Sequence, residues 1–186
     1  MKTGFYIFVE GSDDSRFINK VIRPVIEDEF NFIKIIEYAQ KSKDAIERFI
    51  KSINSMPADY IFLGDLDLYD CFLEKIESII DTFDVLDKEK VYVVIKEMES
   101  WYLAGIDSSC AKSLDINHFR DTEKVDKEKF LALMPESFDS VIDYKQELLK
   151  CFSIDTAVTQ NDSFRYFLIM SFNLTKLLHK LVILQA

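Results

Sequence analysis

The chain has 186 residues, 48% of them hydrophobic and 13% aromatic, and its formal net charge is −10. This much apolar material supports a packed core and argues against global disorder, and no run approaches the roughly 18 apolar residues of a membrane span. The acidic balance argues against a monomer that binds nucleic acid simply by being basic. Because the N-terminus has no signal pattern, we expect a cytoplasmic protein with no membrane contact.

Four β-prone runs alternate with amphipathic helical patterns over the first hundred residues. The runs are 5–9, 32–38, 60–63 and 91–95, and the helical patterns between them are 12–26, 45–53 and 72–83. Pro24 is expected to kink or divide the first helix. The βαβαβαβ alternation predicts an α/β fold with a mainly parallel four-stranded sheet flanked by helices, although it does not specify the strand order.

The rest of the chain has no convincing strand. Residues 96–104 leave the last strand and soon become helical, and 127–134, 144–152 and 163–184 have helical patterns. We therefore expect an α/β core over 1–105 and an α-helical extension over 106–186 that packs on the core, because no linker is long enough to make it independent. The apolar stretch 174–186 indicates burial in the core, or contact with another copy of the chain or a partner.

The three cysteines, Cys71, Cys110 and Cys151, are far apart, odd in number and without C-x-x-C spacing. They indicate neither a zinc site nor a disulfide framework. We expect all three to be free thiols.

Acidic residues follow three of the predicted strands. Glu10 comes after the first strand, Asp65 and Asp67 after the third, and Glu97 and Glu99 after the fourth. In a parallel sheet these ends lie at one edge, where open α/β sheets bind their ligands. Carboxylates close together repel unless protonated or bridged by cations, and oxygen-only ligands suit Mg²⁺ or Mn²⁺. Because such ions clamp phosphates and activate water, phosphoryl or phosphodiester chemistry is the expected reaction class.

Other interpretations of the Asp65-Leu66-Asp67 turn stay open. An Asp-rich turn after a strand is more often a solvated loop or a helix cap than a metal site. Nucleotide-sugar transferases also place an Asp-x-Asp after an apolar strand, but Glu10 has no role there and the chain is short for that fold. Phosphatases of the haloacid dehalogenase type have their nucleophilic Asp after the first strand, where this chain has Glu10.

Three segments together resemble the acidic motifs of Toprim domains, in the same order and at strand ends. They are 9–14, 63–67 and 97–104. The match is to small stand-alone relatives of the overcoming-lysogenization-defect (OLD) nucleases, and it covers about residues 4–105. The resemblance implies a Toprim/Rossmann-like fold and a Mg²⁺- or Mn²⁺-dependent nuclease that hydrolyses DNA or RNA phosphodiester bonds, in a setting of bacterial defence.

The resemblance also implies roles for individual residues. Glu10 matches a general acid/base or metal-linked glutamate, and Asp65 and Asp67 match the metal-binding Asp-x-Asp. Glu97 and Glu99 match the downstream acidic motif less closely, and the resemblance implies that all five acids are catalytic and that Glu99 is a further metal ligand.

Two features of the family are harder to place. The basic residue that some of these nucleases hold near the scissile phosphate has only candidates by type, which are Lys43, Lys96 and Lys145. Asp14 is a further acid that helix capping explains equally well.

The chain lacks the ATPase domain of full-length OLD proteins, so such a partner would be a separate chain. A competing hypothesis is therefore a catalytically silent Toprim-like binding module that acts with a partner protein.

Overall fold

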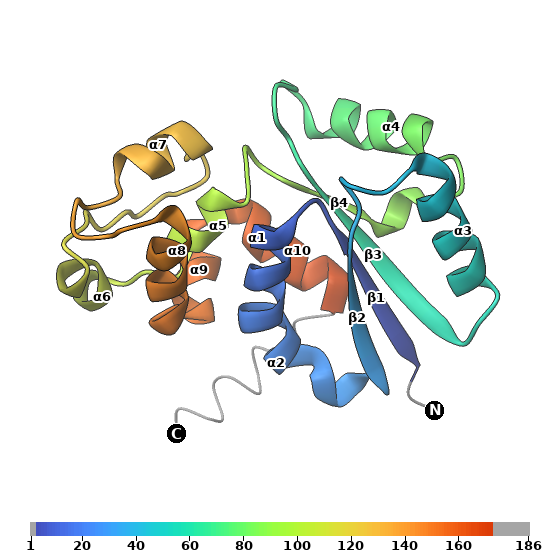
Figure 1. Cartoon of the computed structure of the whole chain (residues 1–186), viewed down its shortest axis with the longest axis horizontal. Helices are drawn as coiled ribbons and strands as arrows, with labels where there is room; N and C mark the ends of the chain where they lie inside the picture. The colour runs from blue at the N-terminus through green and yellow to red at the C-terminus, as the bar shows by residue number, and fades with distance from the viewer. Residues whose placement is uncertain (1–2, 173–186) are drawn as a thin grey trace. The chain divides into compact units, whose positions relative to one another are not determined.

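A computed structural model describes residues 3–172 of the chain (Figure 1). The predicted α/β fold is confirmed: four parallel strands form one sheet in the order β2-β1-β3-β4. The strands are Gly4–Val9 (β1), Phe32–Glu37 (β2), Ala58–Asp65 (β3) and Val91–Val94 (β4). Most positions of β1 and β3 are buried, as expected for apolar strands covered on both faces.

Helical segments connect the strands. The first connection begins as α1 (Ser12–Phe17), widens into a π-helical turn over Ile18–Ile22 and ends as α2 (Arg23–Ile26). Pro24 occupies the first turn of α2, so the predicted division of this helix is confirmed. The missing N–H of proline and the clash of its ring with the preceding turn account for the wider π-helical geometry there.

The helices α3 (Lys43–Asn54) and α4 (Phe72–Thr82) cover one face of the sheet, and α1 and α2 lie on the other (Figure 1). The core beneath α3 and α4 is formed by side chains that alternate along the strands and repeat along the helices. Its buried members are Phe8, Ile36, Ile46, Ile50, Ile53, Tyr60, Phe62, Ile79, Leu86 and Val91. On the opposite face, Phe5 contacts Phe172 and Tyr92 contacts Phe167, with ring centroids 5.8 Å and 5.6 Å apart.

The described chain forms two compact units, 3–93 with 167–172, and 94–166. The second unit is helical: α5 (Glu99–Ala104), α6 (Ser108–Ser113), α7 (Lys127–Ala132), α8 (Val141–Lys150), α9 (Ile154–Gln160) and the start of α10 (Asp162–Phe172). Its core is aromatic. Trp101 is fully buried, its ring lies 5.1 Å from that of Phe164, and its indole N–H donates to the Ser163 hydroxyl at 2.9 Å.

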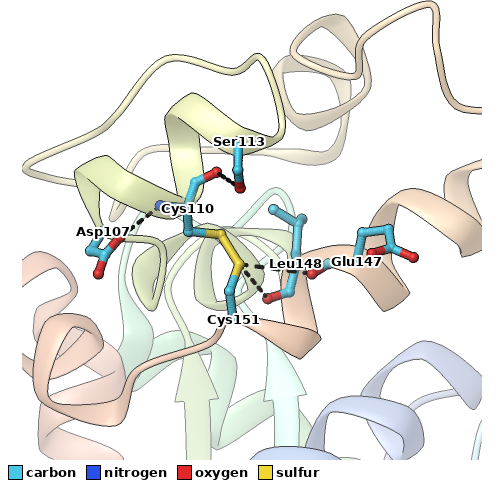
Figure 2. The surroundings of a disulfide bond; sticks show 6 residues. All are labelled: Asp107, Cys110, Ser113, Glu147, Leu148 and Cys151. Atoms are coloured by element: carbon cyan, nitrogen blue, oxygen red, sulfur yellow. Dashed lines mark hydrogen bonds between the residues drawn. A yellow bond between two sulfur atoms is a disulfide. The ribbon is translucent and has the colours of Figure 1, made fainter.

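The cysteine prediction is wrong for two of the three residues. Cys110 on α6 and Cys151 just after α8 form a disulfide, with Cα atoms 6.2 Å apart (Figure 2). Residues 41 positions apart become neighbours because α6 and the end of α8 lie side by side, which no spacing rule in the sequence reveals. Cys71 is a free, half-buried thiol.

Helices 127–134 and 144–152 are present with slightly different ends, whereas the short helices α6 and α9 were not predicted. Beyond β4, residues 95–172 contain no strand. Helix 163–184 is present as far as Phe172, and the rest of it, with the apolar stretch 174–186, lies outside the described residues. Within 3–172, no helix is long and apolar enough to cross a membrane.

Candidate functional site

The strand order determines where the predicted acids lie. The chain passes from β1 to β2 on one side and then to β3 on the other side of β1, so the direction of winding reverses between β1 and β3. Open α/β sheets bind ligands beyond the strand ends at such a point. Phe8 pairs with Phe62, and Glu10 and Asp65 follow these two residues by two and three positions. The two acids therefore stand at adjacent strand ends.

Tyr38 directly follows β2, and the pKa of its hydroxyl is affected by several acids. Its half-buried ring stacks on Phe62 with centroids 4.4 Å apart, and its hydroxyl donates to the Leu63 carbonyl at 3.0 Å. Burial raises the pKa of Tyr38 well above its ordinary value, and further contributions come, in decreasing order, from the negative charges of Glu10, Asp65, Asp14 and Asp67. The four acids come from two segments, 10–14 and 65–67, which follow the adjacent strands β1 and β3.

We call Glu10, Asp14, Asp65 and Asp67 the carboxylate edge. Asp14 is its most enclosed member, since it is buried and accepts a hydrogen bond from the Gly11 backbone N–H at 2.9 Å. This bond satisfies a donor at the start of α1, so the capping explanation of Asp14 has direct support. Glu10 is exposed and Asp65 half-buried.

The backbone changes direction between the two aspartates. Asp65 is the last residue of β3, whereas Asp67 has a φ of 52°, in the left-handed region that Asp and Asn tolerate better than most residues. The alternation of a strand therefore does not set the direction of the Asp67 side chain. Gly64 is buried, and a Cβ atom there would lie 2.9 Å from Ile79 Cδ1 and 3.6 Å from the Tyr38 hydroxyl, so the missing side chain lets α4 approach the strand end.

A lysine that the sequence did not single out lies at the carboxylate edge. Lys75, on the first turn of α4, places its Nζ 2.5 Å from Asp67 Oδ2 and 5.2 Å from the centre of the Tyr69 ring. The Lys75 side chain is 15% exposed and that of Asp67 is 46% exposed. The pair is therefore partly shielded from water, and Lys75 balances one charge of the edge.

Glu97 and Glu99 belong to the second unit and make contacts there. The Glu97 carboxylate accepts a hydrogen bond from the backbone N–H of Lys127, the first residue of α7. Glu99 is buried and forms an ion pair with Lys145 at 2.8 Å, and the side-chain exposures are 10% and 2%. The Lys145 ammonium also lies 5.2 Å from the centre of the Tyr102 ring. These contacts give both glutamates a structural function in their own unit.

The other two lysines suggested as phosphate contacts differ in setting. Lys43 is exposed at the start of α3 and forms ion pairs with Glu47 and Asp84 at 3.5 Å and 3.3 Å. Lys96 is half-buried and has a φ of 65°, between β4 and α5. Neither arrangement indicates a phosphate site.

The donor set of the carboxylate edge fits a hard divalent cation, because all of its side-chain donors are carboxylate oxygens. As the side chains stand, however, no three His, Cys, Asp or Glu residues within 3–172 are grouped to hold a metal ion. Asp67 is paired with Lys75 and Asp14 with a backbone N–H. A cation that used Asp67 would therefore have to replace the Lys75 ammonium.

No family model matches the chain, and no curated protein matches it in sequence. Among solved structures, the chain is similar to the C-terminal region of the Burkholderia pseudomallei OLD protein. The TM-score is 0.49 and the sequence identity 16%, over 89% of this chain and 95% of that one. At this level the likeness says nothing about which residues act or on what.

Proposed function

We propose that the chain is a metal-dependent nuclease of Toprim type that hydrolyses DNA or RNA phosphodiester bonds at the carboxylate edge. The observation that carries the proposal is that Glu10 and Asp65 follow the adjacent ends of β1 and β3 at the winding reversal, with Asp14 and Asp67 in the same two segments. So many like charges favour a bound cation, and phosphodiester hydrolysis is a reaction that such cations serve. A bound Mg²⁺ or Mn²⁺ would supply charge neutralisation at the phosphate and a more acidic water.

The residues of the edge take separate roles in this proposal. Asp65 and Asp67 hold the metal, and Glu10, which is exposed, completes the site or moves a proton to or from the reacting water. Tyr38 holds the end of β3 through the hydrogen bond that its hydroxyl donates to the Leu63 carbonyl. The motif resemblance also includes Glu97 and Glu99, but we assign them no role in catalysis, only the structural contacts within their own unit. The same resemblance extends the proposal to bacterial defence with a separate ATPase chain.

The test is a cleavage assay with labelled single- and double-stranded DNA and RNA, with Mg²⁺, with Mn²⁺ and with a chelator. Asp65→Asn and Asp67→Asn keep the shape of each side chain, and Asn tolerates the left-handed backbone at position 67. Each should reduce cleavage by about 100-fold or more, because charge is lost where the metal is held. Asp28→Asn, at an exposed position shortly before the start of β2, is the matched control and should leave cleavage unchanged. Full activity of an Asp65→Asn, Asp67→Asn double variant would refute the proposal.

A second candidate function is a Toprim-like binding module without catalysis that acts with a partner protein. The observation in its favour is the Lys75–Asp67 ion pair, which supplies the edge with a cation of its own. A module of this kind would bind its partner equally well with chelator and with Mg²⁺, and it would cleave no nucleic acid.

A further inference from the structure

A group of large apolar side chains stands exposed directly beside the carboxylate edge. Four such residues lie within a six-residue segment that starts immediately after Asp67. The exposed fractions are 99% for Leu68, 36% for Tyr69, 48% for Phe72 and 48% for Leu73. A folded protein rarely leaves so many large apolar residues uncovered in one short stretch unless something binds there.

Hydrogen bonds hold Tyr69 at its backbone and at its hydroxyl. Its backbone N–H donates to the Leu66 carbonyl at 3.1 Å, and its hydroxyl donates to Ser78 Oγ on α4 at 2.7 Å. The Lys75 ammonium lies 5.2 Å from its ring centre. The same ammonium is bonded to Asp67, so one lysine links the exposed ring to the carboxylate edge. Tyr69 is therefore a rigid aromatic surface at a set position beside the acids.

The charges around these rings limit what they can bind. Asp70 and Glu74 are exposed in the same segment, so phosphate groups are repelled from it. The faces of nucleobases carry no net charge and stack on aromatic rings whatever their sequence. In a duplex those faces are covered by neighbouring base pairs everywhere except at the two ends, so unpaired bases present far more of them.

We propose that Tyr69 and Phe72 form a stacking surface for unpaired bases, so that the substrate is single-stranded or has a frayed end. The inference rests on the proposed function. A strand whose scissile phosphate lies at the carboxylate edge has its neighbouring nucleotides within reach of a surface that begins at the next residue along the chain.

The test measures binding of a short fluorescein-labelled oligothymidylate by anisotropy, with Ca²⁺ in place of Mg²⁺ so that binding is read separately from cleavage. In a Tyr69→Leu, Phe72→Leu double variant the rings are removed while apolar area is kept. Its affinity should be lower on the order of tenfold or more, because stacking is lost. Tyr69→Phe keeps the ring but loses the bond to Ser78, so its affinity should lie between those of the wild type and the double variant. Phe49→Leu is the matched control, since Phe49 is 37% exposed on α3, outside this segment.

Equal affinities of the double variant and the wild type would overturn the inference and leave the nuclease proposal standing. Equal cleavage of blunt duplex and single strand by the wild type would also overturn it. If instead the wild type binds the oligothymidylate through the rings but cleaves nothing, the nuclease proposal fails and the stacking surface is supported. A third contrary result would be that the wild type self-associates, that a Leu68→Ser, Leu73→Ser double variant does not, and that the ring variants bind the oligothymidylate normally. The surface would then bind a second copy of the chain.

Discussion

Lys75 balances the charge of Asp67, one member of the carboxylate edge. Its ammonium takes the place near Asp67 that a divalent cation would take, so the two should compete. We predict that Lys75→Met, which keeps the length of the side chain, strengthens Mn²⁺ binding by roughly three- to tenfold, about 0.6–1.4 kcal/mol for a half-buried pair. Isothermal titration calorimetry measures this directly. Lys88→Met, which breaks an exposed pair with Glu77, is the control and should leave the affinity unchanged. Weaker Mn²⁺ binding by Lys75→Met would mean that the lysine supports the metal site.

Tyr38 offers a test of the carboxylate edge that requires no metal. Removing a nearby negative charge should lower the pKa of its hydroxyl, because the phenolate would then be repelled less. We expect Glu10→Gln to lower the pKa more than Asp67→Asn, following the order of their contributions. Replacing Tyr38 by a fluorinated tyrosine of lower intrinsic pKa brings the titration into reach of fluorine NMR. Asp70→Asn serves as the control, and an unchanged titration in Glu10→Gln would show that Glu10 is distant from the hydroxyl.

Glu10, Asp65 and Asp67 were predicted to lie near one another because each follows a buried strand, and parallel strand ends meet at one edge. The parallel sheet is confirmed, whereas the role of these acids in a site stays a prediction. Lys75 could not be found this way, since it lies on the next helix and its contact with Asp67 depends on how α4 approaches Gly64. The left-handed backbone of Asp67 could not be predicted from the sequence either, because Asp occurs in many backbone conformations.

At the scale of elements, the pairing of α5 with α8 depends on a buried charge pair. Glu99 of α5 and Lys145 of α8 lie 2.8 Å apart with little exposure, so removal of either charge leaves the other buried without this partner. We predict that Lys145→Met lowers the free energy of unfolding by about 3–5 kcal/mol. Adding Glu99→Gln should restore much of that loss, because both positions are then neutral.

Urea denaturation followed by Trp101 fluorescence measures these changes, since Trp101 is the only tryptophan and lies on α5. Lys150→Met is the matched control, because Lys150 is an exposed lysine of α8 paired with Glu147. Its effect should not exceed about 1 kcal/mol, as for other exposed pairs. If Lys145→Met unfolds at the same urea concentration as the wild type, the pair does not hold α5 and α8 together.

The longer helices that cover the sheet were the easiest elements to identify in the sequence. Helices α3 and α4 have 12 and 11 residues and a continuous apolar stripe, so their patterns are clear. Helix α6 has six residues and α9 seven, which is fewer than two turns each. Their position is set by caps, such as the Asp107 side chain that accepts from the Cys110 N–H at 2.8 Å, and such caps also occur in loops.

Because the described chain divides into two compact units, we expect each unit to have its own stability. The Cys110–Cys151 disulfide lies in the second unit and joins residues 41 positions apart. A cross-link over such a loop restricts the unfolded chain and stabilises the fold by about 4 kcal/mol in the chain-entropy account. Unit 1 contains no part of this loop, so it should not share the stabilisation.

We therefore predict that a Cys110→Ser, Cys151→Ser double variant unfolds its second unit at a lower urea concentration, as measured by Trp101 fluorescence. The β-sheet circular dichroism signal comes from the first unit, and the midpoint of its transition should shift much less. Dithiothreitol should shift the wild type to the position of the double variant and leave the double variant unmoved. Cys71→Ser, at the free thiol of the first unit, should not change the Trp101 transition. The contrary result has two parts: dithiothreitol does not shift the wild-type transition, and Cys110 and Cys151 react with iodoacetamide before any reductant is added. Together they would show that the disulfide does not form in solution.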